Sequence, residues 1–237
     1  LVHCNYSALR RYCLGQLRQM YPSAIAEIAL SPTDRNLYAT LRSHLTPPFP
    51  TALAILGLEG VREIDSWLSS TNLMRNELQN DYPVPLVLWV NDEIIKRTIR
   101  LAPDFADWCT SIELTVAPED LLREIRAAGD RLFSMVLDVG ADQFPANQTI
   151  FGDEYISELR AAVRELQNYG LGLTPLLEAN YQFAIGRDFY LEDEIDRAIE
   201  HYQNSLNFWQ PLLPPTSTVL VEGETPHSTP PVVMDMS

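Results

Sequence analysis

The amino-acid sequence predicts an α/β domain built on a five-stranded, mostly parallel, doubly wound sheet, followed by an α-helical region. Residues 83–116 carry most of this prediction. A continuous apolar run (Val84–Val90) precedes a polar turn, an amphipathic helix and a second β-rich run (Ile112–Val116). A strand that is apolar on both sides is typical of a parallel sheet whose two faces are covered. Strand-like and helix-like segments also alternate before this unit, as they do in doubly wound sheets.

The first part of this domain is predicted to hold three strands and two helices. The first helix, Tyr6–Met20, has apolar residues on one face and ends before Pro22. The second helix begins at Ser31, the expected N-cap, with a proline and an aspartate in its first turn. The strands expected around these helices are 1–4, 24–30 and 52–58.

The second part is predicted to add two strands and further helices. A polar helix over residues 61–82 is expected to break near Ser69–Asn72. The strand-helix-strand unit follows, and a helix begins at Pro118 with two acidic residues in its first turn, where the helix dipole favours them. We therefore place the α/β domain at residues 1–139.

Beyond residue 139 the sequence predicts only helices and irregular chain. Gly140–Gly152 has the composition of a linker, and residues 153–210 are predicted to be helical, with Gly170 as a C-cap. Residues 211–237 contain proline, serine, threonine and glycine without periodicity, which is typical of a disordered tail. The expected helices are 153–169, 175–190 and 192–209.

Charge is distributed unevenly along the chain. Residues 1–116 hold 10 basic and 12 acidic side chains, whereas residues 117–237 hold 7 basic and 20 acidic ones. The acidic half disfavours binding to nucleic acid or to an anionic membrane. No apolar run approaches the roughly 18 residues of a membrane span. The chain starts inside an expected strand without a methionine, so we expect it to be a fragment of a longer protein.

The number and spacing of the cysteines indicate the redox state of the compartment in which the protein resides. Cys4, Cys13 and Cys109 are odd in number, widely spaced and set among apolar residues, without a CxxC motif. Buried free thiols are the interpretation that this pattern favours, and they fit a reducing compartment. We therefore expect a cytoplasmic protein.

One segment of the helical region has a spacing typical of paired helices. Within Ala179–Gln210, small residues recur where two antiparallel helices would approach closely, and aromatic residues stand where the space between them would be filled. The segment resembles one tetratricopeptide repeat, although Gln182 stands where the first aromatic is expected and no second copy follows in register. The alternative is a generic helical hairpin. The positions that match the repeat are Gly186, Phe189, Ala198, Tyr202 and Ser205.

The α/β part also resembles a known domain. Its order of elements, and the segment Pro85–Glu113 most specifically, are similar to the degenerate P-loop NTPase-type domain of the STAND and AAA-like group, which precedes tetratricopeptide repeats in some bacterial, notably cyanobacterial, proteins. The resemblance covers about residues 1–137. It implies that Leu1–Cys4 is the first strand, Ala52–Leu58 the Walker B strand and Leu86–Val90 the sensor strand.

The residues that would bind a nucleotide are missing from this pattern. Phosphate binding needs glycines, a lysine and a serine or threonine for Mg²⁺, but the loop Asn5–Ala8 has neither glycine nor lysine. The only lysine, Lys96, lies within the helix after the fourth strand. The Walker B strand ends at Glu59 without the aspartate that would hold a metal, and Glu59 itself is interpreted as an ordinary loop residue. We expect no catalysis and no cofactor.

Metal binding is not predicted either. The acidic residues at 192–196 lack the spacing of a calcium loop and lie at a helix start, where acids are favoured anyway. The histidines lie in separate elements and form no ligand or triad pattern: His3, His44, His201 and His227.

The sequence thus favours a non-catalytic scaffold that binds another protein or a peptide. A second interpretation is a nucleotide-regulated signalling ATPase of the STAND type whose phosphate loop lies outside this chain. A third is a small-molecule enzyme that uses a cleft at the carboxyl ends of the strands. The residues that such a cleft would display are Asn5, Ser31, Glu59, Asn91 and Asp92.

Overall fold

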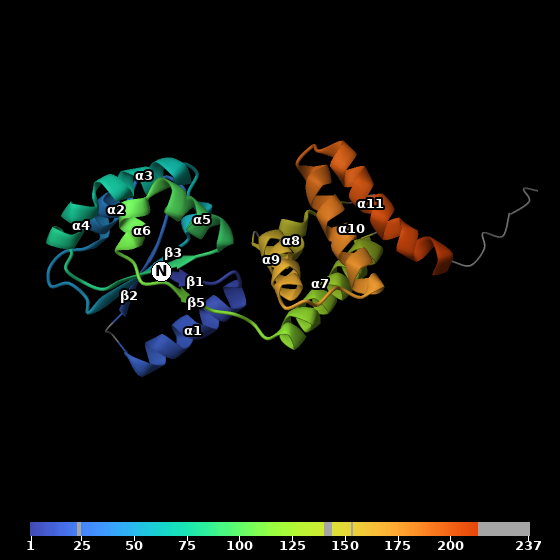
Figure 1. Ribbon diagram of the computed structural model, residues 1–237, viewed down its shortest axis with the longest axis horizontal. Coiled ribbons are helices and arrows are strands. Elements are labelled where there is room, and N and C mark those ends of the chain that lie inside the picture. The colour runs from blue at the N-terminus through green and yellow to red at the C-terminus, as the bar shows by residue number, and fades with distance from the viewer. Residues whose placement is uncertain (23–24, 140–143, 153, 213–237) are drawn as a thin grey trace, which may run out of the picture.

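The structure is a computed structural model that describes residues 1–22, 25–139, 144–152 and 154–212. It contains a sheet part and a helical part, which lie side by side (Figure 1). The prediction of a five-stranded parallel sheet is confirmed: all four strand pairings are parallel, in the order β2-β3-β4-β1-β5. The strands are β1 (Val2–His3), β2 (Ile25–Ala29), β3 (Ala52–Leu56), β4 (Leu86–Val90) and β5 (Ile112–Glu113).

The central strand β4 explains why its sequence is apolar throughout. It pairs with β3 on one side and with β1 on the other, where His3 lies opposite Val90. Leu88, Trp89 and Val90 are all at most 3% exposed although they point to alternating faces. Both faces of this strand are therefore covered, as the continuous apolar run predicts.

Helices cover the two faces of the sheet unequally. Helix α1 (Ser7–Met20) packs on one face through Leu14, which lies in a cluster with Trp89. The opposite face carries the larger core, in which Trp67 is fully buried. The helices on that face are α2 (Leu37–His44), α3 (Ile64–Leu73), α4 (Arg75–Asp81), α5 (Asp92–Leu101) and α6 (Pro103–Asp107).

The predicted start of the second helix was wrong. Helix α2 begins at Leu37 and its N-cap is Asn36, whose side chain accepts a hydrogen bond from the backbone N–H of Ala39 at 2.8 Å. Ser31 instead closes a turn, because its N–H donates to the Asp34 carboxylate at 2.7 Å. Asparagine and serine both cap helices well, so the sequence alone did not distinguish the two positions.

Two other boundaries differ from the prediction. Strand β3 ends at Leu56 because Gly57 has a left-handed φ of 83°, which turns the chain into the short 3-10 helix η1 (Leu58–Gly60). The polar helix breaks at Met74, between α3 and α4, rather than at residues 69–72.

The helical part forms its own core. Helix α7 (Pro118–Val139), which we assigned to the α/β domain, packs through Leu121, Ile125 and Leu132 against the later helices. None of the described helices combines the length and hydropathy needed to span a membrane. The other elements are α8 (Asn147–Phe151), α9 (Tyr155–Asn168), α10 (Pro175–Leu191), α11 (Ile195–Trp209) and the 3-10 helix η2 (Gln210–Leu212).

The predicted linker contains a short helix, α8, with two buried residues, Asn147 and Ile150. In α8, Asn147 is fully buried, donating to the carbonyl of Ala184 at 2.9 Å and accepting from Arg187 at 3.1 Å. The hydrogen bonds of a buried polar side chain to a helix that is distant in sequence leave no local sequence pattern. The prediction of a linker, which was based on composition, was therefore wrong for this helix. The predicted disordered tail begins one residue inside η2, and its residues 213–237 lie outside the described part of the chain.

Candidate functional site

The carboxyl ends of the parallel strands meet at one edge of the sheet, which is where α/β proteins bind ligands. Of the five candidate residues, Asn5 follows β1, Glu59 lies in η1 after β3, and Asn91 and Asp92 follow β4. These four are brought to the same edge. Ser31, after the outer strand β2, forms its own turn with Asp34 and has no hydrogen bond to any of the four within the described residues.

Asn5 and Asp92 connect the carboxyl ends of the neighbouring strands β1 and β4. The Asn5 amide donates to the Asp92 carboxylate at 3.2 Å, and the Asp92 N–H donates back to the Asn5 oxygen at 2.9 Å. His3 Nε2 lies 2.6 Å from the same carboxylate. Burial raises the pKa of Asp92, but the hydrogen bond from Asn5 and the charge of Arg164 outweigh it and hold that pKa below its usual value. Asn91 caps α5 by accepting the N–H of Ile94 at 2.9 Å.

Helix α9 of the helical part covers this edge with carboxylates. Glu158 accepts a hydrogen bond from the backbone N–H of Ser7, the first residue of α1, at 2.7 Å. The Asn5 amide also donates to Glu165 at 3.1 Å. The N-terminus of α1 is the place where a phosphate would accept backbone hydrogen bonds. In this structure a carboxylate of the same chain takes that place.

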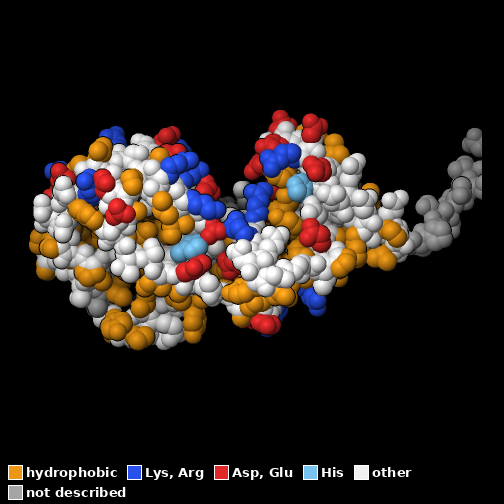
Figure 2. Space-filling model, viewed as in Figure 1, with side chains coloured by type: hydrophobic (Ala, Val, Ile, Leu, Met, Phe, Trp, Pro, Cys, Tyr) orange, Lys and Arg blue, Asp and Glu red, His pale blue; other side chains and the backbone are white. Residues whose placement is uncertain are grey.

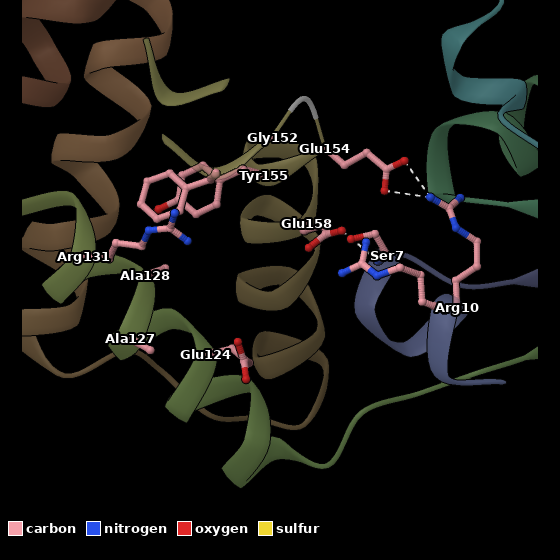
Figure 3. A pocket seen from close by; sticks show the side chains of 12 residues that line it. Ser7, Arg10, Glu124, Ala127, Ala128, Arg131, Gly152, Glu154, Tyr155 and Glu158 are labelled. Atoms are coloured by element: carbon pink, nitrogen blue, oxygen red, sulfur yellow. Dashed lines mark hydrogen bonds and ion pairs between the residues drawn. The ribbon is translucent and has the colours of Figure 1, made fainter. Parts of the chain in front are cut away.

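Arg10 of α1 joins the two parts (Figure 3). Its guanidinium donates to Glu59 at 2.5 Å and to both oxygens of Glu154, just before α9, at 2.6 and 2.9 Å. Burial raises the pKa of Glu59, but hydrogen bonding and the charge of Arg10 bring it below its usual value. Burial and the neighbouring Glu59 carboxylate raise the pKa of Glu154 above its usual value. One cation therefore holds two carboxylates, one from each part of the chain.

A fourth residue pair completes the connection between the two parts. Arg164 of α9 forms an ion pair with Asp92. We call this set of contacts the interdomain latch: Asn5, Ser7, Arg10, Glu59 and Asp92 on the sheet part, and Glu154, Glu158, Arg164 and Glu165 on the helical part.

Two of the hollows beside the latch are lined by side chains of both charges, so neither of these two favours an ion. One of about 720 Å³ lies at the ends of β2 and β3, where Arg18 and Glu27 neutralise each other through two hydrogen bonds at 2.5 and 2.6 Å. The other, of about 450 Å³, lies between α1, α7 and the start of α9 (Figure 3). Its charges are balanced: Arg10, Arg11, Arg131, Glu124, Glu154 and Glu158. No group of three or more side chains suited to a metal ion is found in the described ranges.

Helices α10 and α11 form a hairpin that contains the positions matched to the repeat. Three residues join α10 to α11, and Asp193 among them has a left-handed φ of 61°. Gly186 of α10 is at the closest approach, because a Cβ on it would lie 3.0 Å from the Tyr202 ring and 3.2 Å from His201 Cβ. The other three matched positions are at most 5% exposed: Phe189, Ala198 and Ser205.

The latch residues on the helical part were missed by the sequence analysis. Glu154, Glu158 and Glu165 recur at spacings of four and seven residues, which places them along one side of α9. A row of acids on one side of a helix is usually a solvated face, so the spacing alone did not indicate a contact. Their partners Ser7 and Arg10 are more than 140 residues away in the sequence.

The thiols provide a test of the predicted reducing compartment. All three cysteines are free in the structure; Cys4 is buried, and Cys13 and Cys109 are half-buried. Burial raises the pKa of the Cys4 and Cys109 thiols, which lowers the fraction of reactive thiolate. Mass measurement after alkylation of the native protein should show little modification of these two, and full modification of all three after unfolding. A disulfide in freshly purified protein would contradict the cytoplasmic assignment.

Comparison of the chain with protein-family models, with curated proteins and with solved structures gave no match.

Proposed function

We propose that this chain is a non-catalytic protein-interaction module of the bacterial cytoplasm. In this proposal a degenerate, P-loop NTPase-like α/β domain serves as a scaffold for a tetratricopeptide-like hairpin. The observation that carries the proposal is the interdomain latch. At the edge of the sheet that would hold a ligand, three hydrogen-bond donors are engaged by carboxylates of the helical part: the Asn5 amide, the Ser7 N–H and Arg10.

The charges at this edge support the loss of nucleotide binding. A phosphate at the N-terminus of α1 would have to displace Glu158 and would lie among the carboxylates of Glu154 and Glu165. Like charges at such short range oppose binding. Lys96 is exposed on α5, and Arg10, the cation of α1 at this edge, is already engaged by Glu59 and Glu154. These contacts weigh against nucleotide binding at the N-terminus of α1 in this chain.

The hairpin formed by α10 and α11 supports the proposal that the chain binds a protein or a peptide. Helices α10 and α11 approach closely at Gly186, and hairpins of this kind present rigid surfaces to peptides and proteins. The latch would fix the sheet part to the helical part, so that the sheet part supports the hairpin. The proposed partner is therefore a protein or a peptide, recognised by the helical part.

Titration with ATP tests the proposal. A fluorescent ATP analogue with Mg²⁺ is expected to show no saturable binding below the millimolar range, because the loop after β1 offers neither glycine nor lysine to the phosphates. A Glu158→Gln variant, which lacks the carboxylate charge at α1, serves as the matched comparison. Micromolar binding by the wild-type chain would contradict the proposed function.

A further inference from the structure

An apolar strip runs along the outer side of α11. Ile195, Ile199 and Leu206 are 42%, 48% and 52% exposed, although they are aliphatic residues in a well-formed helix. Their spacing of four and seven residues places them on one side of the helix. Tyr202, whose ring packs against Gly186 of α10, borders this side. The strip is about 16 Å long at 1.5 Å per residue, which is three turns of a partner helix.

The two flanks of the strip differ. On one flank Trp209 packs edge-to-face against Phe133 of α7, with ring centres 5.5 Å apart, so the strip borders an aromatic cluster. On the other flank lie Asp196 and Glu200, both exposed and without an ion pair in the described part of the chain. The strip is therefore apolar along its length. It is bordered by aromatic rings on one flank and by acidic side chains on the other.

The nearby cation does not neutralise this acidic flank. Arg197 projects to another side of α11, where its guanidinium lies 3.8 Å from the centre of the Phe189 ring. It pairs with Glu194 at 2.7 Å. Asp196 and Glu200 therefore remain available to a positively charged partner, as do the exposed acids that precede the helix, Glu192 and Asp193.

Charge also distinguishes between the possible occupants of the strip. A second copy that packed strip against strip in an antiparallel arrangement would bring the acidic flanks into one interface, and the whole chain carries a net charge of −15. An acidic partner would meet the same repulsion. A helix with apolar residues at i, i+3/i+4 and i+7 and basic residues on one flank would match the strip and its acidic side.

We infer that the α11 strip binds an amphipathic helix with a basic flank. This inference rests on the proposed function and adds to it the chemical class of the partner. The apolar side of the partner would cover Ile195, Ile199 and Leu206. Its lysines or arginines would lie beside Asp196 and Glu200.

Three synthetic peptides test the inference against the full chain. All share one apolar helical face; the first has a lysine flank, the second a glutamate flank, and the third is a scrambled form of the first. Fluorescence anisotropy should show binding of the lysine-flanked peptide at least about tenfold tighter than that of the other two. The scrambled peptide controls for non-specific attraction of a cationic peptide to an acidic protein.

Variants locate the binding site. A double change of Ile199→Ser and Leu206→Ser should weaken binding of the lysine-flanked peptide at least about tenfold. Leu73→Ser, at an aliphatic residue of α3 that is 75% exposed, should leave it unchanged. Asp196→Asn with Glu200→Gln should reduce the preference for lysine over glutamate. Circular dichroism checks that each variant remains folded.

Several results would overturn the inference. Equal binding of the glutamate-flanked peptide would show that the basic flank is irrelevant, and unchanged binding by the serine variants would place the peptide elsewhere. A dimer in sedimentation velocity that the serine variants dissociate would make a second copy the occupant. The ATP titration tests the proposed function separately, so each can fail without the other.

Discussion

Replacing Arg10 by methionine is expected to lower the free energy of unfolding by about 3 kcal/mol, because Glu59 and Glu154 then lose their shared cation. This value is the low end of the range for a buried pair, since the Glu154 side chain is 35% exposed and water screens part of its charge. Methionine keeps most of the volume of the arginine stem, so the loss reports charge rather than packing. Urea unfolding at neutral pH gives the measurement.

Two comparisons make this result specific. Arg11→Met changes the neighbouring, exposed arginine and should alter the unfolding free energy by less than about 0.5 kcal/mol. Glu154→Gln introduced into the Arg10→Met variant should restore part of the loss, because it removes a carboxylate that has no partner. If Arg10→Met and Arg11→Met behave alike, Arg10 does not hold the two parts together.

The latch should also weaken in acid. Glu59 and Asp92 have folded-state pKa values below their usual ones, so their stabilisation is present above the usual carboxyl pKa of about 4 and is lost as pH falls through the lower folded values. Glu154 has a raised folded-state pKa, so its ionised form destabilises the folded state at neutral pH, and this cost is lost as pH falls. Arg10→Met removes the main partner of Glu59, so its difference from wild type should shrink as pH falls from 6 to about 3.

Replacing Ala198 by leucine is expected to lower the free energy of unfolding by roughly 1–3 kcal/mol through overpacking. Ala198 is 1% exposed and packs with Ile185 and Phe189 of α10, where the two helices already approach at Gly186. The added side chain has no space unless the helices separate. Thermal unfolding followed by circular dichroism should show a lower midpoint than wild type.

Glu200→Leu is the matched control for Ala198→Leu. It introduces the same side chain two residues along α11, on the exposed side, and should change the melting temperature little. Equal effects of the two changes would mean that the hairpin register, and with it the support from the repeat-like spacing, is wrong.

The parts that the sequence predicted well are those in which local pattern and burial agree. The apolar run of β4 becomes a strand that is buried on both faces, and Gly186 and Ala198 become the contact between α10 and α11. In each case the periodicity of the chain reports which side chains avoid water. The start of α2 was mistaken because two capping residues compete within six positions, and only hydrogen-bond geometry selects Asn36.

The sequence by itself determined the α/β class, the parallel sheet and the absence of glycine and lysine from the loop that directly follows β1. Each of these depends on residue type and short-range order. Only the tertiary structure decided that Glu154, Glu158 and Glu165 cover the sheet edge, and that α7 and α8 belong to the helical core. An acid on a helix surface has the same pattern whether it faces water or a distant N–H group. Contacts over more than 140 residues are set by how the two parts pack, which no local periodicity records.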